Sequence, residues 1–369
     1  MAQTIPPMKT SLRLVATAFT LLASVALAQP AASSPYKVIT SAKVGGAGGF
    51  DYVQADPDGR RLYIPRGNPA NHVSVYDLDT LKPVGEIPDT AGVHGAAIDP
   101  KTHHGFSSSK PVVMWDTQTL ATIKTIAVEG NPDGILFVPE TSQVYVLSHR
   151  APNVTVINSA DGAVVGTIDL GGAPEQAQAD GQGHVFIDVE DKANVAVVDA
   201  KTLKVTAHYD LSSKASTPAG LALDAKNHIL FACCREPTAC VILNAADGKI
   251  ITSLPLAGGS DGAVFNPATM EALCSHGNGT LTVIKENSPT DFVVEQDVQT
   301  KAGAKTCTLD PKTNRVLLIT AERAPPPAQP ATPPPAPAGG EQPAGARRGG
   351  GGRGGAMVPD SFTILAVGR

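Results

Sequence analysis

Residues 135–172, ILFVPETSQVYVLSHRAPNVTVINSADGAVVGTIDLGG, contain four short apolar runs separated by turn-forming residues. The first run begins one residue earlier, at Gly134, and the four runs cover residues 134–138, 143–147, 154–157 and 164–168. Their β-branched and aromatic side chains suit pleated, packed strands. The Pro, Asn, Asp and Gly residues between them suit tight turns. This stretch therefore predicts four consecutive strands joined by short loops.

The same pattern repeats along the chain. A turn follows the first apolar run at seven places: Asp56-Pro57, Asp99-Pro100, Val138-Pro139, Asp180-Gly181, Asp224-Ala225, Asn266-Pro267 and Asp310-Pro311. The spacings of 43, 39, 42, 44, 42 and 44 residues match a four-stranded propeller blade. We therefore expect an all-β, seven-bladed β-propeller that forms a single domain over residues 36–369.

The two ends of the chain predict how the ring closes. The last unit starts at Lys305 and runs out of sequence before a fourth strand. Residues 38–41, VITS, are similar to residues 250–253, IITS, which form a fourth strand in another unit. We expect this N-terminal strand to complete the last blade, which removes open sheet edges at the seam.

The first 28 residues have the features of a signal peptide. Lys9 and Arg13 precede an uncharged apolar stretch, residues 14–27, and Ala26-Leu27-Ala28 is a small-x-small cleavage site. The stretch is short for a membrane span, and no later segment is long and apolar enough. The sequence therefore predicts an exported protein, periplasmic or secreted. The alternative interpretation of the apolar stretch is a buried N-terminal helix.

Residues 324–360 are rich in Pro, Gly and Arg and interrupt the last unit between its second and third strands. Such a composition buries little apolar surface, so we expect a disordered loop. Its arginines leave nucleic acid or an acidic glycan open as a partner. However, the formal net charge of −5 argues against nucleic acid as the default partner, and a solvated loop is the simpler interpretation.

The chain has five cysteines: Cys233, Cys234, Cys240, Cys274 and Cys307. Cys234 and Cys240 flank residues 235–239, which are typical of a hairpin loop, so these two residues are candidates for a disulfide. The odd number leaves at least one thiol free. The alternative, that all five are small core residues, stays open.

The repeat resembles the YVTN-repeat family of β-propellers, with YncE-like proteins among its members. The matching segments are residues 144–146 (VYV), 153–157 (NVTVI) and 161–162 (DG), with counterparts at 62–64 and 72–77. The namesake tetrapeptide is not reproduced, since Leu147-Ser148 follows Tyr145-Val146. The resemblance implies the fold and exported proteins of unclear role. Related seven-bladed propellers include lactone hydrolases, but no catalytic motif carries over.

One loop position per repeat is expected at the mouth of the central channel, on the face that also carries the loops between second and third strands. We call this the top face. The positions, here called the first ring, are Asp51, His94, Asp133, Glu175, Ala219, Asp261 and Lys305. The four carboxylates Asp51, Asp133, Glu175 and Asp261 are candidate ligands for Ca²⁺ or Mg²⁺, and a histidine suits Zn²⁺ or Mn²⁺. His94 is the candidate catalytic proton carrier. A wet, polar mouth without a ligand is the alternative.

A second, largely basic ring is expected around the first. It comprises Arg66, Lys110, His149, Arg150, Arg235, His276 and Arg323. Of these, Arg66, His149, Arg150, Arg235 and His276 are the candidate ligand-binding residues. The alternative is a solvated rim of loop charges.

These features favour a monomeric, exported binding scaffold that holds a protein, a polymer or a small ligand on its top face. The alternative is a metal-dependent hydrolase of lactone-type substrates at the channel mouth. The sequence has no G-x-S-x-G, P-loop or H-E-x-x-H motif.

Overall fold

The structure, a computed structural model, describes residues 1–4, 35–325 and 357–369. The first four residues have no regular structure, and residues Pro35–Arg369 form one compact unit. The described residues contain strands β1–β28 and a single 3₁₀ turn, Glu190–Lys192. Most of the predicted signal peptide and of the predicted loop at 324–360 lies outside the described residues.

The strands form seven antiparallel sheets of four, and each sheet is one blade of a propeller. Blade 1 contains β2 (Gln54–Asp56), β3 (Arg61–Arg66), β4 (His72–Asp77) and β5 (Pro83–Ile87). Blade 2 contains β6 (Ala96–Asp99), β7 (His104–Ser107), β8 (Val112–Asp116) and β9 (Thr122–Ile126). Blade 3 contains β10 (Pro132–Val138), β11 (Gln143–Ser148), β12 (Val154–Asn158) and β13 (Val164–Ile168).

The next three blades follow in the same order. Blade 4 contains β14 (Pro174–Ala179), β15 (His184–Val189), β16 (Asn194–Asp199) and β17 (Lys204–Asp210). Blade 5 contains β18 (Ser216–Asp224), β19 (Ile229–Glu236), β20 (Thr238–Asn244) and β21 (Ile250–Pro255). Blade 6 contains β22 (Ser260–Asn266), β23 (Glu271–His276), β24 (Thr280–Ser288) and β25 (Asp291–Gln299).

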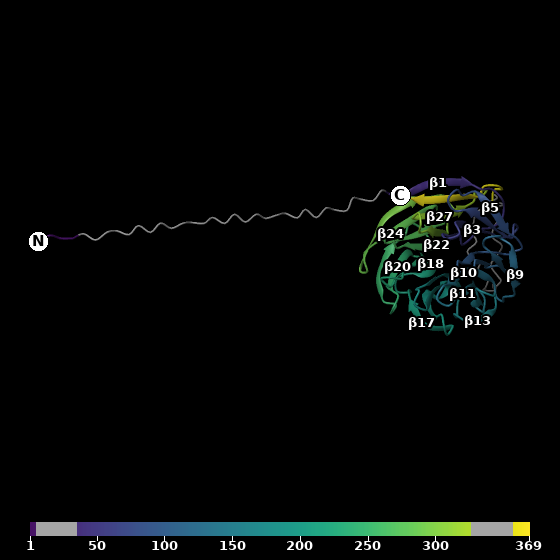
Figure 1. Ribbon diagram of the computed structural model, residues 1–369, viewed down its shortest axis with the longest axis horizontal. Coiled ribbons are helices and arrows are strands. Elements are labelled where there is room, and N and C mark those ends of the chain that lie inside the picture. Colours follow the sequence, from purple (N-terminus) through teal and green to yellow (C-terminus); the bar gives the residue numbers. More distant parts are fainter. Residues whose placement is uncertain (5–34, 326–356) are drawn as a thin grey trace, which may run out of the picture. The chain divides into compact units, whose positions relative to one another are not determined.

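Blade 7 joins the two ends of the chain and confirms the predicted closure (Figure 1). It contains β26 (Cys307–Asp310), β27 (Arg315–Thr320), β28 (Thr363–Gly368) and, as its fourth strand, β1 (Lys37–Lys43). β1 pairs antiparallel with β28. Beside it, the Tyr36 hydroxyl donates to Glu271 Oε2 of blade 6 at 2.7 Å, which links the seam to the neighbouring blade.

Burial explains why the strand pattern is nearly continuous rather than alternating. The second and third strands of a blade are buried on both faces, as in β11, where five of six residues are buried. The outermost strand is mostly exposed, as in β13. Among the described residues, the buried side chains form seven apolar clusters, each between two adjacent blades. The stability of the ring therefore depends on contacts between blades.

The repeated turn has a local cause. The acidic or amide side chain at its first position accepts a hydrogen bond from the backbone N–H two residues later, as Asp99 does from Lys101 at 2.9 Å. The same bond forms at Asp56, Asp180, Asp224, Asn266 and Asp310. Val138 has no such oxygen. These bonds fix the tight turn between the first and second strands of six blades.

The long loop of the last blade leaves the sheet after Thr320 and returns at Thr363. At its base, Arg323 and Met357 form an isolated antiparallel bridge, and Val358 N–H donates to Glu322 O at 2.8 Å. The described ends of the loop are therefore held side by side.

Cys234 and Cys240, the candidate disulfide pair, do not lie opposite each other, because Cys234 pairs with Ala239. The hairpin between β19 and β20 is tighter than expected, because Arg235 pairs with Thr238. This register places Cys233, not Cys234, opposite Cys240. All five cysteines are buried free thiols, which agrees with the alternative that they are core residues.

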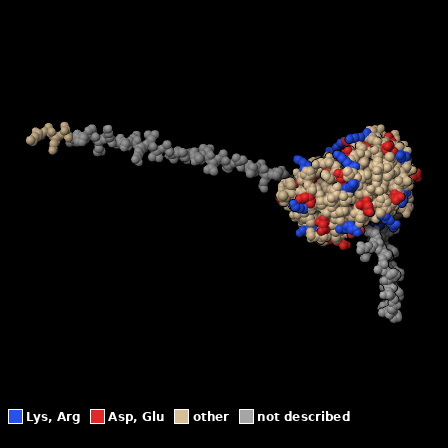
Figure 2. Space-filling model, turned by 90° about the horizontal axis from the view of Figure 1, so that it is seen from below, with Lys and Arg blue, Asp and Glu red and all other residues tan. Residues whose placement is uncertain are grey.

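Charged side chains are scattered over the propeller surface. Figure 2 shows one face, on which acidic and basic side chains are interspersed without a large area of one sign. Within the described ranges, we find no helix with the length and hydrophobicity needed to cross a membrane.

Candidate functional site

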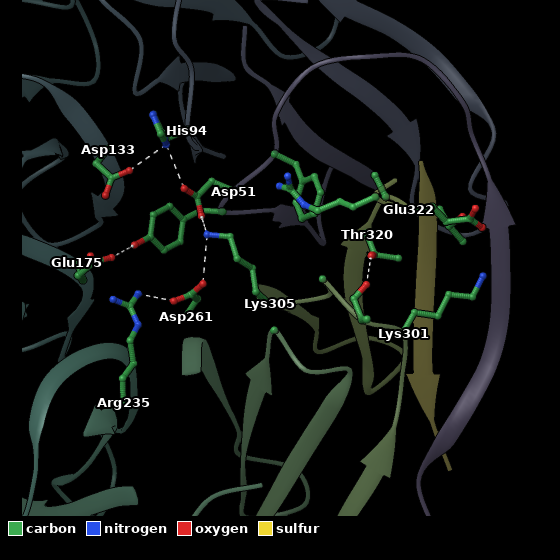
Figure 3. Close-up of a pocket in the computed structure, with 18 of the residues that line it drawn as sticks. Asp51, His94, Asp133, Glu175, Arg235, Asp261, Lys301, Lys305, Thr320 and Glu322 are labelled. Carbon is green, nitrogen blue, oxygen red and sulfur yellow. Dashed lines mark hydrogen bonds and ion pairs between the residues drawn. The ribbon is translucent and has the colours of Figure 1, made fainter. Parts of the chain in front are cut away.

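A cavity of about 1040 Å³ opens on the top face at the mouth of the channel (Figure 3). Six of the seven first-ring positions line it, each from a different blade: Asp51, His94, Asp133, Glu175, Asp261 and Lys305. The seventh, Ala219, is fully buried and adds no polar side chain. The structure thus brings these residues together, and their roles as ligands stay predictions.

β-Bulges set the position of three of these lining residues, Asp133, Glu175 and Asp261. In blades 3 to 6 the register between the first and second strands shifts at the first-ring residue. The shifts contain Asp133, Glu175, Ala219 and Asp261. A bulge leaves a residue outside the ladder and re-aims its side chain, so the same device recurs in four blades.

Two histidines and three carboxylates form one side of the site. His94 Nδ1 lies 3.0 Å from both Asp51 Oδ2 and Asp133 Oδ1. His149 Nε2 lies 3.0 Å from Asp133 Oδ2 and 3.5 Å from Glu175 Oε1. Asp133 is therefore shared between the two imidazoles. We call these five residues the histidine–carboxylate cluster.

The opposite side of the site consists of strong cations and their partners. Lys305 Nζ lies 3.0 Å from Asp51 Oδ1 and 3.2 Å from Asp261 Oδ2. Arg235 pairs with Asp261 and, at 2.5 Å, with Glu190. Asp261, predicted as a metal ligand, thus lies between two permanent cations and outside the histidine–carboxylate cluster. Figure 3 shows the alternation of charges around the mouth.

The carboxylates change the protonation of both histidines. Asp133 and then Glu175 raise the pKa of His149 to about 10. Burial alone lowers the pKa of His94, but Asp51 and Asp133 raise it further, so the net shift is upward. In the absence of another cation, both imidazoles therefore favour the charged form, with which they balance the neighbouring carboxylates.

The same principle holds on the Lys305 side. Burial disfavours the charge on Lys305, yet Asp51 and Asp261 raise its pKa overall. Burial likewise works against ionised Asp51, while Lys305 and His94 lower its pKa overall. Asp51 is thus held as an anion between Lys305 and His94.

Sequence reasoning missed three residues of this region. Tyr52 donates its hydroxyl to Glu175 Oε2 at 2.8 Å. Glu190, in the 3₁₀ turn after β15, lines the cavity and pairs with Arg235. Asp188, two residues before Glu190, is fully buried, and burial and then Glu175 raise its pKa well above the usual range. Of the three, only Tyr52 could have been found from the sequence, because it directly follows the first-ring residue Asp51.

The second ring is only partly assembled. His149, Arg235 and Arg323 line the cavity. Arg66 does not line the cavity: it is 1 % exposed, donates to Gly45 O and Ala47 O, and lies over the Phe362 ring. His276 is also buried, with Nε2 at 2.9 Å from Thr282 Oγ1. Lys110 and Arg150 are exposed and lie outside the cavity lining.

The histidine–carboxylate cluster has the donors of a cation site. Asp51, His94 and Asp133 each offer one ligand atom within 4.8 Å of the others, and so do Asp133, His149 and Glu175. Ligands held about 2 Å from a tetrahedral Zn²⁺ lie roughly 3.3 Å apart. The observed separations of 3.0 to 3.5 Å along each His–carboxylate contact therefore need little adjustment. A proton on the imidazole and a divalent cation are alternative sources of the positive charge.

Known structures confirm the architecture. A hydrazine synthase structure from Kuenenia stuttgartiensis covers 74 % of this chain and 92 % of its own, at 18 % identity and a TM-score of 0.64. The WD40 repeats of RRP9 cover 90 % and 97 %, at 11 % identity and a TM-score of 0.66. A chain of the mitotic checkpoint complex covers 83 % and 96 %, at 10 % identity and a TM-score of 0.66.

The chain is a seven-bladed β-propeller with WD40-like neighbours. No family model and no curated protein matches the chain. At these identities the likeness extends to the fold alone, since one fold hosts many functions.

Proposed function

We propose that this propeller is an exported binding scaffold whose top-face cavity holds a divalent cation and, next to it, a small polar ligand. The observation that carries the proposal is the histidine–carboxylate cluster that lines the cavity. Two imidazole nitrogens each face two carboxylate oxygens, at 3.0 to 3.5 Å. This arrangement concentrates metal-ligating atoms where the cavity opens to solvent.

The donor set favours particular cations. Imidazole nitrogen suits Zn²⁺ and other transition metals, whereas Ca²⁺ and Mg²⁺ take oxygen ligands. Because a histidine stands between each pair of carboxylates, Zn²⁺ or Mn²⁺ is expected to bind more tightly than Ca²⁺ or Mg²⁺. The cavity of about 1040 Å³ leaves room for a ligand beside the ion.

The test is thermal unfolding of the mature protein, first treated with chelator and then titrated with each of the four cations. A cation that binds only the folded state raises stability by about 2.7 kcal/mol at 100 times its Kd. We expect a raised midpoint with Zn²⁺ or Mn²⁺, and a smaller rise in Asp133→Asn. Unchanged midpoints with all four cations would contradict the proposal.

Export and family membership are parts of this proposal that rest on the sequence. The signal-peptide features of residues 1–28 support a periplasmic or secreted location. The repeat supports membership of the YVTN-repeat (YncE-like) group. Fractionation of cells that express the full chain tests the location, with N-terminal sequencing expected to find cleavage after Ala28.

Lactone hydrolysis was the second candidate function from the sequence, and none of the comparisons supports it. A nucleic-acid partner is likewise not favoured, because acidic and basic groups around the cavity pair with each other.

A further inference from the structure

We infer that the cavity binds two divalent cations side by side, with Asp133 as the carboxylate that bridges them. This inference rests on the proposed function, because it specifies how the cation site is built. It adds the number of ions, the ligands of each ion and the class of ligand that the pair attracts.

The geometry of Asp133 is the first observation. This side chain is buried, with 6 % of the residue exposed. Its two oxygens face different imidazoles: Oδ1 lies 3.0 Å from His94 Nδ1, and Oδ2 lies 3.0 Å from His149 Nε2. A carboxylate placed between two such nitrogens can bind one ion through each oxygen. Ions bridged in this way lie about 3.5–4 Å apart in two-metal sites.

Each half of the site then has an equivalent set of donors. The first half has His94, a carboxylate of its own, Asp51, and one oxygen of the shared Asp133. The second half has His149, a carboxylate of its own, Glu175, and the other oxygen of Asp133. Three protein ligands per ion leave an open coordination position, as in sites that bind an exchangeable ligand.

The outer carboxylates are already oriented for this role. Asp51 presents Oδ2 to His94, while its Oδ1 accepts from Lys305 at 3.0 Å. Glu175 presents Oε1 to His149, while its Oε2 accepts from the Tyr52 hydroxyl at 2.8 Å. Contacts of this kind fix the direction of metal ligands and tune their affinity. Lys305 and Tyr52 are thus positioning residues.

Charge indicates what the pair of ions attracts. The three carboxylates of the cluster carry three negative charges, so one divalent cation leaves an excess of one negative charge and two leave an excess of one positive charge. A two-ion site with an open position on each ion therefore attracts an anionic oxygen ligand, such as a carboxylate or a phosphate. The cavity above the cluster provides the space for it.

The experiment measures how many ions bind per chain. Chelator-treated protein is titrated with Zn²⁺ by calorimetry and, after gel filtration, its metal content is determined by mass spectrometry. We expect two ions per chain for the parent protein and one for each of His94→Ala and His149→Ala. Mn²⁺-loaded parent protein should show the electron paramagnetic resonance spectrum of a spin-coupled pair.

His184→Ala is the matched control, because His184 also pairs with an aspartate, Asp180, at 2.7 Å but lies outside the cavity lining. It should retain two ions. One ion per chain in the parent overturns the bridged pair and leaves the proposed function standing, whereas no bound ion overturns both. Two ions that persist in both His94→Ala and His149→Ala also overturn the assignment. Circular dichroism verifies that each variant is folded.

Discussion

Tyr52 reaches across the channel mouth and donates its hydroxyl to Glu175 Oε2 at 2.8 Å, although 123 residues separate the two in the sequence. Tyr52 precedes the first strand of blade 1, and Glu175 lies in the bulge of β14 in blade 4. Burial and then the charge of Glu175 raise the pKa of Tyr52 well above its usual range, so the hydroxyl remains a donor. This bond orients the Glu175 carboxylate toward His149.

Replacing Tyr52 by Phe is expected to weaken cation binding through Glu175. The substitution removes the donor and leaves a buried carboxylate oxygen without it, at a cost of about 1–3 kcal/mol in unfolding free energy. Tyr209→Phe is the matched control, since its hydroxyl bonds Ala245 O at 2.9 Å away from the cavity. Urea unfolding measures the stability and calorimetry the Zn²⁺ affinity. Equal Zn²⁺ affinities for the two variants would contradict the orienting role.

The buried carboxyl group of Glu286 is expected to make the free energy of unfolding depend on pH. This side chain is 2 % exposed and accepts from Asn227 Nδ2 at 2.9 Å. Burial raises its pKa from 4.5 to about 7. The folded state thus holds this proton more tightly than the unfolded state, and the stability it contributes is lost as the pH rises from 4.5 through 7. The full loss is about 3 kcal/mol.

Glu286→Gln should therefore be more stable than the parent at pH 8, by about 1–3 kcal/mol, and nearly unchanged at pH 4. Urea unfolding at the two pH values measures the difference. Glu140→Gln, at an exposed position, is the control and should change the unfolding free energy by less than about 0.5 kcal/mol at either pH. A Glu286→Gln variant that is less stable than the parent at pH 8 would show that the charged form is favoured.

The thiols are expected to be unreactive in the folded protein. All five cysteines are buried, and burial raises the pKa of Cys307 to about 12. Because burial denies an aromatic disulfide reagent access to the sulfur atoms, the reagent should label no thiol in native protein and five in denaturant. Cys233 Sγ and Cys274 Sγ lie 2.8 Å apart in adjacent blades. If oxidation occurs, peptide mapping should find Cys233 linked to Cys274. A link between Cys234 and Cys240 would contradict the observed register of β19 and β20.

The loop of blade 7 is expected to be dispensable for folding. Arg323 and Met357 already form a bridge at its base, so Asn-Gly in place of residues 324–356 should form a tight hairpin turn. Shortening the loop lowers the entropic cost of closing it, so we expect the free energy of unfolding to rise by up to about 2.5 kcal/mol. Thermal and urea unfolding measure the change. A variant that fails to fold would show that the replaced residues hold the ring together.

The top-face positions were predictable because the repeat is regular. Units of 39 to 44 residues place one residue per blade at the channel mouth, and counting from the repeated turn identified six polar lining residues. The same counting placed Arg66 and His276 on the top face, but both side chains are buried outside the cavity lining, since a side chain changes face with every residue along a strand. Burial could not be read from the spacing. Glu190 was missed because its loop contains a 3₁₀ turn in this blade alone among the described residues.

By itself, the sequence determined the number of blades, the strands of each blade, the turn chemistry and the closure of blade 7 by β1. These features depend on local patterns that repeat along the chain. Only the tertiary structure decided that Asp133 is shared by His94 and His149, and that Asp261 pairs with Arg235 and Lys305. The reason is that these residues come from different blades, and ring closure and the bulges set which side chains meet.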